Sequence, residues 1–186
     1  QERATADQQR QLAALYEVSK LLGSSLDLKE VLSQTMDAII QLTGAERGFL
    51  MSRQSDGELK FEIARGLSHV NLDEDEFKVS MTIVHRVAES GEVILTTNAQ
   101  EDPRFENKMS IAAYKLRSIL CVPLKIKNDL TGVIYVDNKA RVGMFRDDDR
   151  ALLSAFADQA AVAIDNAQLI EDLEKSNAEL QKAYEA

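Results

Sequence analysis

Few residues of this chain have side chains and spacings that could do chemistry, and they do not form a known catalytic motif. The sequence contains no GxGxxG, P-loop, HExxH, CxxC or GxSxG pattern. His69 and His85 could each ligate haem or another metal, but each lacks a local partner, which favours solvated histidines. Cys121 stands in an apolar stretch without a neighbouring base, which indicates a buried, inert thiol rather than a nucleophile. The chemistry of these residues therefore argues against an enzyme.

Two acidic runs are the remaining candidates for a metal site. The run at 73–76 could bind Ca²⁺, but it lacks the alternating Asp or Asn residues and the glycine of a calcium-binding loop. We interpret it as part of a solvated loop over 66–79. The run at 147–149 is more typical of a helix start, where carboxylates interact favourably with the helix dipole. We therefore expect no resident metal or other cofactor.

Composition limits the partners that the chain can have. The formal net charge of −9 argues against binding to nucleic acid and to anionic lipid, because both require lysine and arginine. No apolar run approaches the roughly 20 residues of a membrane span, so direct membrane insertion is not expected. The single cysteine permits no internal disulfide, which fits a reducing, cytoplasmic location.

The elements that must position these side chains centre on a β-hairpin predicted over residues 117–139. Its first arm, 118–127, puts four apolar residues on one face: Leu120, Val122, Leu124 and Ile126. Its second arm, 131–138, is a run of β-branched and aromatic residues, which is typical of a strand buried on both faces. Asn128-Asp129 is predicted to form the turn, since both residues tolerate a left-handed backbone. We expect this hairpin in the middle of a covered sheet.

The rest of the chain is predicted to supply strands beside this hairpin and helices over it. Three further strands are expected at 46–53, 58–65 and 93–97. Helices are expected at 12–22, 28–40, 81–90, 108–116 and about 148–184. Gly44 and Gly91 are predicted to end helices, and Ser80 is predicted to be an N-cap. In the last helix an a/d seam is expected along Leu169, Leu173, Ser176, Leu180 and Tyr184.

Four segments, in this order and spacing, resemble the GAF domain family over about residues 15–169. They are DPRF at 102–105, RSILCVPL at 117–124, GVIYVDN at 132–138, and a Phe-x-x-x-Asp pattern followed by Leu-Leu and ADQAAVAIDNA within 145–167. The resemblance implies an α/β (α+β) fold with a GAF/PAS-like central antiparallel sheet of five to six strands. It implies five strands here in the order 2-1-5-4-3, helices on both faces, and long N- and C-terminal helices. It also implies a domain of a bacterial multidomain signalling protein.

The same resemblance implies a small-molecule pocket on one face of the sheet. We expect it between the sheet and the segments 80–84, 102–114 and 118–120. Thr82, Tyr114 and Ser118 are polar side chains beside apolar runs, and they are either pocket residues or satisfied rim residues. The candidate lining residues are Thr82, Ile83, Phe105, Tyr114, Ser118 and Leu120.

A second set of residues matches most of a signature found in cyclic-nucleotide-binding members. The matching residues are Asn138, Lys139, Phe145 and Asp149, whereas Arg150 stands where the signature ends in an acid. The broken signature does not favour a cyclic nucleotide as the ligand, and the Cys-His pair of bilin-binding members is missing. We expect the four matching residues to be structural and outside the pocket. Lys139 and Asp149 are expected to pair and hold a loop against the last helix.

Two classes of function remain open. One is a regulatory sensor, in which a small molecule in the pocket changes the terminal helices and an output domain beyond Ala186. The other is a ligand-free dimerisation scaffold with a vestigial pocket. A reductase-like GAF enzyme needs reactive cysteines, and the one cysteine in an apolar strand argues against it.

Both classes predict a homodimer through the terminal helices and the same division of the chain. Residues 1–24 are expected to form a helical arm, 25–168 the GAF domain, and 169–186 a coiled-coil linker. The linker is expected to lead to an output domain in the same chain.

Overall fold

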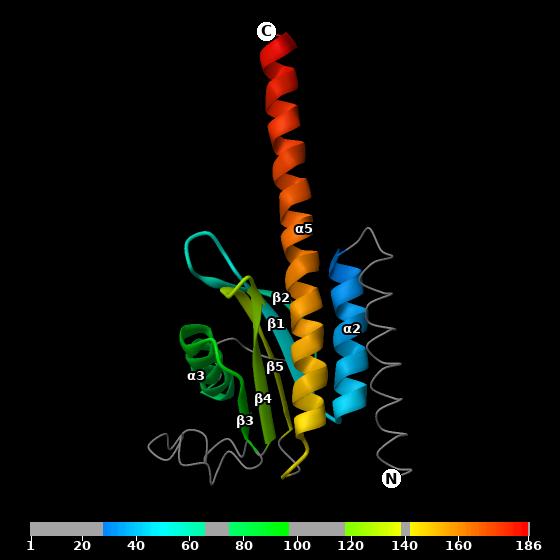
Figure 1. Cartoon of the computed structure of the whole chain (residues 1–186), viewed down its shortest axis with the longest axis vertical. Helices are drawn as coiled ribbons and strands as arrows, with labels where there is room; N and C mark the ends of the chain where they lie inside the picture. Colours follow the sequence, from blue (N-terminus) through cyan, green and yellow to red (C-terminus); the bar gives the residue numbers. More distant parts are fainter. Residues whose placement is uncertain (1–27, 66–74, 97–117, 139–141, 186) are drawn as a thin grey trace.

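The fold of the chain is an antiparallel sheet between two layers of helix (Figure 1). The structure is a computed structural model, and it describes residues 28–65, 75–96, 118–138 and 142–185. The described elements, in chain order, are α2 (Leu28–Thr43), β1 (Arg47–Arg53), β2 (Leu59–Arg65), α3 (Asp75–Ser90), β3 (Ile94–Thr96), β4 (Ser118–Ile126), β5 (Asp129–Asn138) and α5 (Asp147–Glu185). The expected helices at 12–22 and 108–116 lie outside the described residues.

The sheet has the strand order β2-β1-β5-β4-β3, and every neighbouring pair is antiparallel. The order predicted from the family resemblance is confirmed. The β4–β5 hairpin lies near the middle, and both of its strands are almost wholly buried. This agrees with the apolar residues on both faces of these strands, because such strands require cover on each side.

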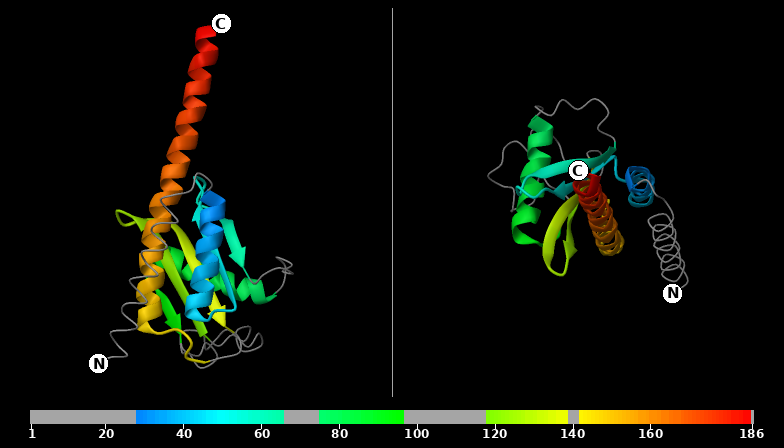
Figure 2. Two further views of the ribbon diagram at one scale, coloured as in Figure 1. Left: turned by 90° about the vertical axis from the view of Figure 1, so that its right-hand side faces the viewer. Right: turned by 90° about the horizontal axis from the view of Figure 1, so that it is seen from above.

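Two hydrophobic layers lie on opposite faces of the sheet. On one face α2 and α5 pack together, and their apolar side chains meet Leu120, Val122 and Leu124 of β4. On the other face α3 packs against Phe49, Ile119 and other side chains of the sheet. Figure 2 shows the same division, with α2 and α5 on the side of the sheet opposite α3. Successive strand residues point to opposite faces, so β4 supplies both layers from one alternating sequence.

Glycines end two of the helices where the sequence predicts. Gly44 follows α2 with a φ of +76°, and its amide donates to the carbonyl of Ile40. Gly91 follows α3 with a φ of +69°, and its amide donates to the carbonyl of Val87. A residue in the left-handed region at this position lets the last turn close its hydrogen bonds, and glycine adopts it without strain.

Three local predictions are wrong, and the first is the loop expected over 66–79, because residues 75–79 belong to α3. The β4–β5 turn is formed by Lys127 and Asn128, with φ values of 51° and 72°, so it lies one residue earlier than predicted. Two consecutive residues with positive φ make a type I′ turn, which matches the twist of the paired strands. Ser80 does not cap a helix, because α3 already begins at Asp75. The side chain of Ser80 instead reaches the sheet.

The last helix extends beyond the sheet and its helical cover (Figure 1). α5 contains 39 residues, which corresponds to a length of about 58 Å at 1.5 Å per residue. Its fully buried residues all precede Val162, and everything after residue 167 is exposed. Among the described helices, none combines the length and the apolar character needed to cross a membrane. The exposed length of α5 carries large apolar side chains, such as Leu173 and Leu180, among its charged residues.

Candidate functional site

The candidate pocket residues on α3 lie against the sheet or beside it. Ile83 is fully buried in the layer between α3 and the sheet. Thr82 is half-buried. Phe105 and Tyr114, and the segment 102–114 that was expected to enclose the pocket, lie outside the described residues.

Leu120 does not belong with Ile83, and the grouping of these two residues must be corrected. Leu120 lies in the layer of α2 and α5, on the other face of the sheet. Ser118, two positions earlier, is buried, and its hydroxyl accepts a hydrogen bond from the amide of Met144 at 3.2 Å. Strand residues alternate between faces, so Ile119 and Cys121 are the β4 residues that face α3.

A ring of hydrogen bonds between the sheet and α3 is the main polar feature of the α3 layer. Arg47 and Asp137 are directly opposite each other on β1 and β5, and the guanidinium donates from two nitrogens to the carboxylate. The hydroxyl of Tyr135 donates to Asp137 at 2.7 Å. Ser80 of α3 donates to the Tyr135 hydroxyl at 3.2 Å and accepts from Arg47 at 3.5 Å. We call these four residues the polar ring.

Burial gives the polar ring its electrostatic character. Arg47, Ser80, Tyr135 and Asp137 are all buried. Burial disfavours the charge on Arg47, but the hydrogen bond and the charge of Asp137 outweigh it and raise the pKa of the guanidinium. Burial, and then the negative charge of Asp137, raise the pKa of the Tyr135 hydroxyl well above its ordinary value. Tyr135 is therefore a neutral donor over the whole physiological range of pH.

An aromatic group continues the polar ring along the sheet. Phe49 stacks on the ring of Tyr135, with centroids 4.8 Å apart and planes 14° apart. Phe61 meets Phe49 edge-on, at 5.3 Å and 71°. The site thus combines a few convergent polar groups with an apolar floor, which is the usual composition of a small-molecule site.

Sequence reasoning missed all four residues of the polar ring as site residues, since Ser80 was predicted only as an N-cap. Arg47 and Asp137 are 90 positions apart, and no local pattern connects them. One signal was available: Asp137 is a carboxylate within the apolar run of β5, and its neighbour Val136 faces the opposite layer. A carboxylate on the buried face of a central strand requires a cation or several donors close by.

The residues of the partial signature have structural contacts. The side-chain amide of Asn138 donates to the carbonyl of Gly44, at the end of α2. Phe145 is buried in the layer of α2 and α5. The carboxylate of Asp149 accepts from the amide of Arg146 at 2.9 Å, so it caps the start of α5. Lys139 lies outside the described residues, and its expected pairing with Asp149 remains a prediction.

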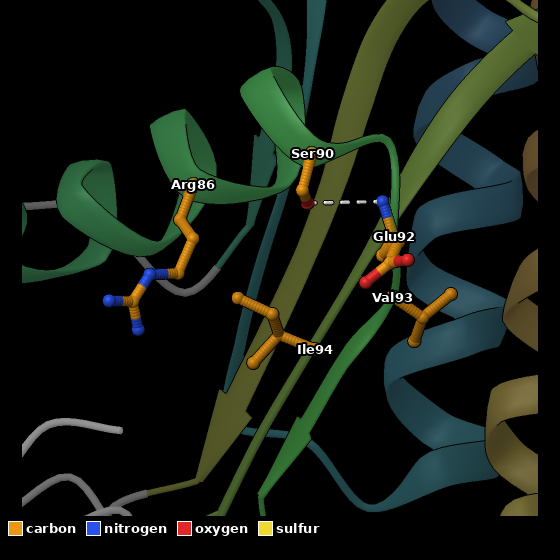
Figure 3. Close-up of a pocket in the computed structure, with 5 residues that line it drawn as sticks. All are labelled: Arg86, Ser90, Glu92, Val93 and Ile94. Atoms are coloured by element: carbon orange, nitrogen blue, oxygen red, sulfur yellow. Dashed lines mark hydrogen bonds between the residues drawn. The ribbon is translucent and has the colours of Figure 1, made fainter.

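A shallow hollow of about 380 Å³ lies away from the polar ring, at the carboxyl end of α3 (Figure 3). It is lined by Arg86, Ser90, Glu92, Val93 and Ile94. The hydroxyl of Ser90 accepts from the amide of Glu92 at 3.2 Å, which closes the turn after the helix. The hollow is open to solvent, and its polar groups do not converge on one point (Figure 3). We therefore treat the polar ring, rather than this hollow, as the candidate functional site.

The other reactive side chains have ordinary surroundings. His85 is exposed on α3, and His69 lies outside the described residues. Cys121 is fully buried, and burial raises the pKa of its thiol well above the ordinary value, which keeps it protonated. Within the described part of the chain, no group of three or more His, Cys, Asp or Glu side chains could hold a metal ion. The run at 147–149 starts α5, as predicted.

Comparison with known proteins gives one family. A family model described as GAF domain matches residues 27–164. The Nif-specific regulatory protein of Azospirillum lipoferum is 31% identical over 130 residues, which cover 68% of this chain and 21% of that protein. The dual 3',5'-cyclic-AMP and -GMP phosphodiesterase 11 of Drosophila melanogaster is 28% identical over 184 residues, which cover 90% of this chain and 12% of that protein. The chain thus spans about a fifth or less of the length of these relatives.

A solved structure has the same fold at low sequence identity. The GAF domain of a phosphoenolpyruvate-protein phosphotransferase from Acinetobacter superposes with a TM-score of 0.68 and 19% identity. The match covers 87% of this chain and 96% of that one. At this identity the likeness establishes the architecture and leaves the ligand of the site to be argued from the side chains.

Proposed function

The chain belongs to the GAF domain family, and we propose that it is the small-molecule-sensing domain of a larger regulatory protein. A GAF domain is a regulatory module, and this one is similar to part of a Nif-specific regulatory protein. We further propose the division of the chain into an arm at 1–24, a domain at 25–168 and a linker at 169–186. A cytoplasmic location belongs to the same proposal.

The observation that carries the sensing proposal is the polar ring at the junction of the sheet and α3. Its donors and acceptors come from two strands and one helix. A bound molecule that replaced the hydrogen bond between Ser80 and Tyr135 would therefore change the attachment of α3 to the sheet. The expected ligand is a small, partly polar molecule that fits beside an aromatic floor. Thr82 and Ile83 remain in the proposed pocket, together with Phe105 and Tyr114. Ser118 is left out because it lies on the same face of β4 as Leu120, and its hydroxyl accepts from the amide of Met144 shortly before α5. Leu120 is left out because it faces α2 and α5.

The test is whether a small molecule stabilises the domain through the polar ring. The purified protein is denatured, and the small molecules released are identified by mass spectrometry. Each of them is then added to the folded protein, together with cyclic AMP and cyclic GMP as defined probes, while the melting temperature is measured. A ligand that binds only the native state at 100 times its Kd adds about 2.7 kcal/mol of stability.

The matched variant is Ser80→Ala, which removes one hydroxyl from the polar ring and leaves the salt bridge in place. We expect a released molecule to raise the melting temperature of the wild type and to raise that of Ser80→Ala much less. If neither a released molecule nor a probe changes the melting temperature of the wild type, the sensing proposal is wrong.

A second candidate function, a ligand-free scaffold, is supported by a different observation. Among the described residues, every buried side-chain nitrogen and oxygen has a hydrogen-bond partner. The polar ring therefore needs no ligand to be satisfied, which would suit a vestigial pocket. The melting experiment separates the two candidates, because a scaffold does not respond to any small molecule.

We expect neither cyclic nucleotide to bind, although the relative from Drosophila is named for its action on both. The side chain of Asn138 is engaged by the carbonyl of Gly44, and Phe145 lies in the layer of α2 and α5. Both therefore contact the layer of α2 and α5 rather than the α3 layer. Stabilisation by cyclic AMP that is lost in Asn138→Ala would overturn this assignment.

We also propose that the domain forms a parallel homodimer through its terminal helices and transmits a signal along α5. Support comes from the exposed apolar residues of α5: Val162, Leu169, Ile170, Leu173, Leu180 and Tyr184. A helix with apolar residues at coiled-coil spacing that the described residues leave exposed is suited to pair with another helix. Light scattering at tens of micromolar should give the mass of a dimer, and a monomer would contradict the proposal.

The hydrogen bonds around the end of β5 support a route from the polar ring to the helices. Asp137 belongs to the polar ring, and its neighbour Asn138 holds the end of α2 through Gly44. Ser118, opposite Asn138 on β4, holds the amide of Met144, shortly before α5 begins. A shift of β5 would therefore change the ends of both helices. In the full-length protein, one residue inserted after Glu174 should rotate the downstream helix by about 100° and alter the output.

A further inference from the structure

The exposed surface of α5 carries three adjacent columns of residues, where a two-stranded coiled coil uses two. At about 3.5 residues per turn, residues seven apart fall in one column. The middle column contains Asn166, Leu173 and Leu180. The first flanking column contains Val162, Leu169, Ser176 and Ala183. The second flanking column contains Ala163, Ile170, Asn177 and Tyr184.

The two flanking columns are equally available for pairing. Leu169 and Ile170, one in each flanking column, are each 58% exposed. Leu173, in the middle column, is 62% exposed. A pair of helices can bury the middle column with the first flank, which we call seam one, or with the second flank, which we call seam two. The two seams are related by a rotation of each helix through about 50°, one seventh of a turn.

The two seams also have similar compositions. They share Leu173 and Leu180. Seam one adds Leu169 and the small polar Ser176, whereas seam two adds Ile170 and the polar Asn177. Each seam therefore adds one polar layer of its own at about the same height, besides Asn166, which both seams share. Neither seam has a clear excess of apolar side chains to bury.

The charges beside the seams indicate which partner fits. In seam one the middle column holds the a positions of the heptad, and the first flank holds the d positions. The residues just before the middle column are then the g positions, and all three are acidic: Asp165, Asp172 and Glu179. An antiparallel pair would bring these g positions against each other, which is unfavourable for like charges. A parallel pair brings each g position against an e position of the partner. In seam one the e positions are uncharged and include Asn177 and Tyr184. In seam two the parallel pair brings Leu169 against Glu174. A second parallel copy of this chain therefore avoids acid–acid contacts in both seams.

We propose that the exposed half of α5 pairs in parallel with a second copy of this chain and exchanges between seam one and seam two. The proposal rests on the homodimer proposed above and deepens it by naming its two states. Such an exchange is a two-state element, and a ligand can bias it only by binding one state more tightly than the other. The rotation between the seams would be carried by the helix to whatever follows it.

The test uses single cysteines as reporters of each seam. Ser176→Cys lies in the core of seam one only, and Asn177→Cys lies in the core of seam two only. Core positions of a parallel pair come within the 4.4–6.8 Å between Cα atoms that a disulfide spans, so they cross-link under mild oxidation. Leu180→Cys, in the core of both seams, is the positive control. The wild type, whose Cys121 is fully buried, is the negative control.

Two matched substitutions favour one seam each. In seam one, Ile170→Lys places an ammonium group opposite Asp165 of the second copy. In seam two, Leu169→Lys places one opposite Glu174 of the second copy. Each substitution also puts a charge into the core of the other seam. We expect Ile170→Lys to raise the cross-linking rate at Ser176→Cys relative to Asn177→Cys by about tenfold, and Leu169→Lys to do the reverse.

In the chain without either lysine substitution, both reporters should cross-link at measurable rates. A dimer in which one reporter alone cross-links, whatever lysine substitution is present, would show a single fixed seam and overturn the proposal. A tetramer by light scattering would overturn it too, since a larger bundle can bury all three columns at once. A monomer would overturn the homodimer as well, whereas the sensing function is tested separately by the melting experiment.

Discussion

A charged pair inside an apolar layer is favourable only if both groups are well paired, and Arg47 and Asp137 meet this condition. The guanidinium and the carboxylate share two hydrogen bonds, and Tyr135 supplies a third to the carboxylate. These contacts lie between buried residues, where water cannot replace a lost partner. Single substitutions in the polar ring should therefore have large effects, and their sizes should depend on which group is left behind.

Asp137→Ala should lower the free energy of unfolding by about 3–5 kcal/mol, because it leaves the guanidinium of Arg47 buried without its carboxylate. Urea denaturation followed by circular dichroism measures this change. The double variant Arg47→Met with Asp137→Leu removes both charges and should be less destabilised than Asp137→Ala. If the double variant were the less stable of the two, buried charge would not be the cause.

The raised pKa of the Tyr135 hydroxyl predicts that the folded protein loses stability at alkaline pH. Its pKa is raised in the folded protein, by burial and then by Asp137, so the folded state holds the proton more tightly than the unfolded state. The resulting stability is complete below the unfolded pKa of about 10 and is lost as the pH rises through the folded pKa. Unfolding in urea at a series of alkaline pH values should show this decline, and Tyr135→Phe should reduce it. Tyr184→Phe, at an exposed position, should leave the decline unchanged.

At the scale of elements, the turn of the β4–β5 hairpin has a backbone conformation that does not suit one of its two residues. Lys127 and Asn128 both have positive φ, and of these two residues only the asparagine tolerates this region well. The hairpin forms nevertheless, because the pairing of two buried strands fixes the turn between Ile126 and Asp129. The packing of the strands thus overrides the preference of the lysine.

Replacing the turn with Asn-Gly, by Lys127→Asn and Asn128→Gly, should stabilise the domain by about 1 kcal/mol. Both new residues fit the type I′ turn better than those present. Chemical denaturation of the double variant and the wild type would measure the gain. Lys127→Val serves as the opposite control, since a β-branched residue at positive φ should destabilise the hairpin. Equal stability of all three would mean that the turn is not strained.

At the scale of the whole molecule, the domain and the exposed half of α5 should behave as separate units. The apolar residues that hold α5 to the sheet end near Ile164, and among the described residues Leu173 and Leu180 do not belong to the hydrophobic core or pack against it. Substitutions in the exposed half should therefore change association and leave the core intact.

Leu173→Glu with Leu180→Glu should convert the proposed dimer to a monomer, because it puts carboxylates into the core of either seam. Light scattering measures the mass, and near-ultraviolet circular dichroism reports whether the domain still folds. Lys175→Glu changes the charge at an exposed residue outside both seams and should leave the mass unchanged. A double variant with the same mass as the wild type would show that α5 does not hold the dimer.

The sequence alone determined which segments form the described strands and helices, and that Leu120, Val122 and Leu124 share one face of β4. These features follow from periodicity and from glycines at helix ends, and both act within a few residues. The tertiary structure decided what the sequence could not. It brought Arg47 to Asp137 across 90 positions and Ser80 to Tyr135 across 55. It also placed Leu120 away from Ile83 and fixed the turn at Lys127. The physical reason is that contacts between distant residues depend on strand register and on which faces pack together, and neither is encoded by local spacing.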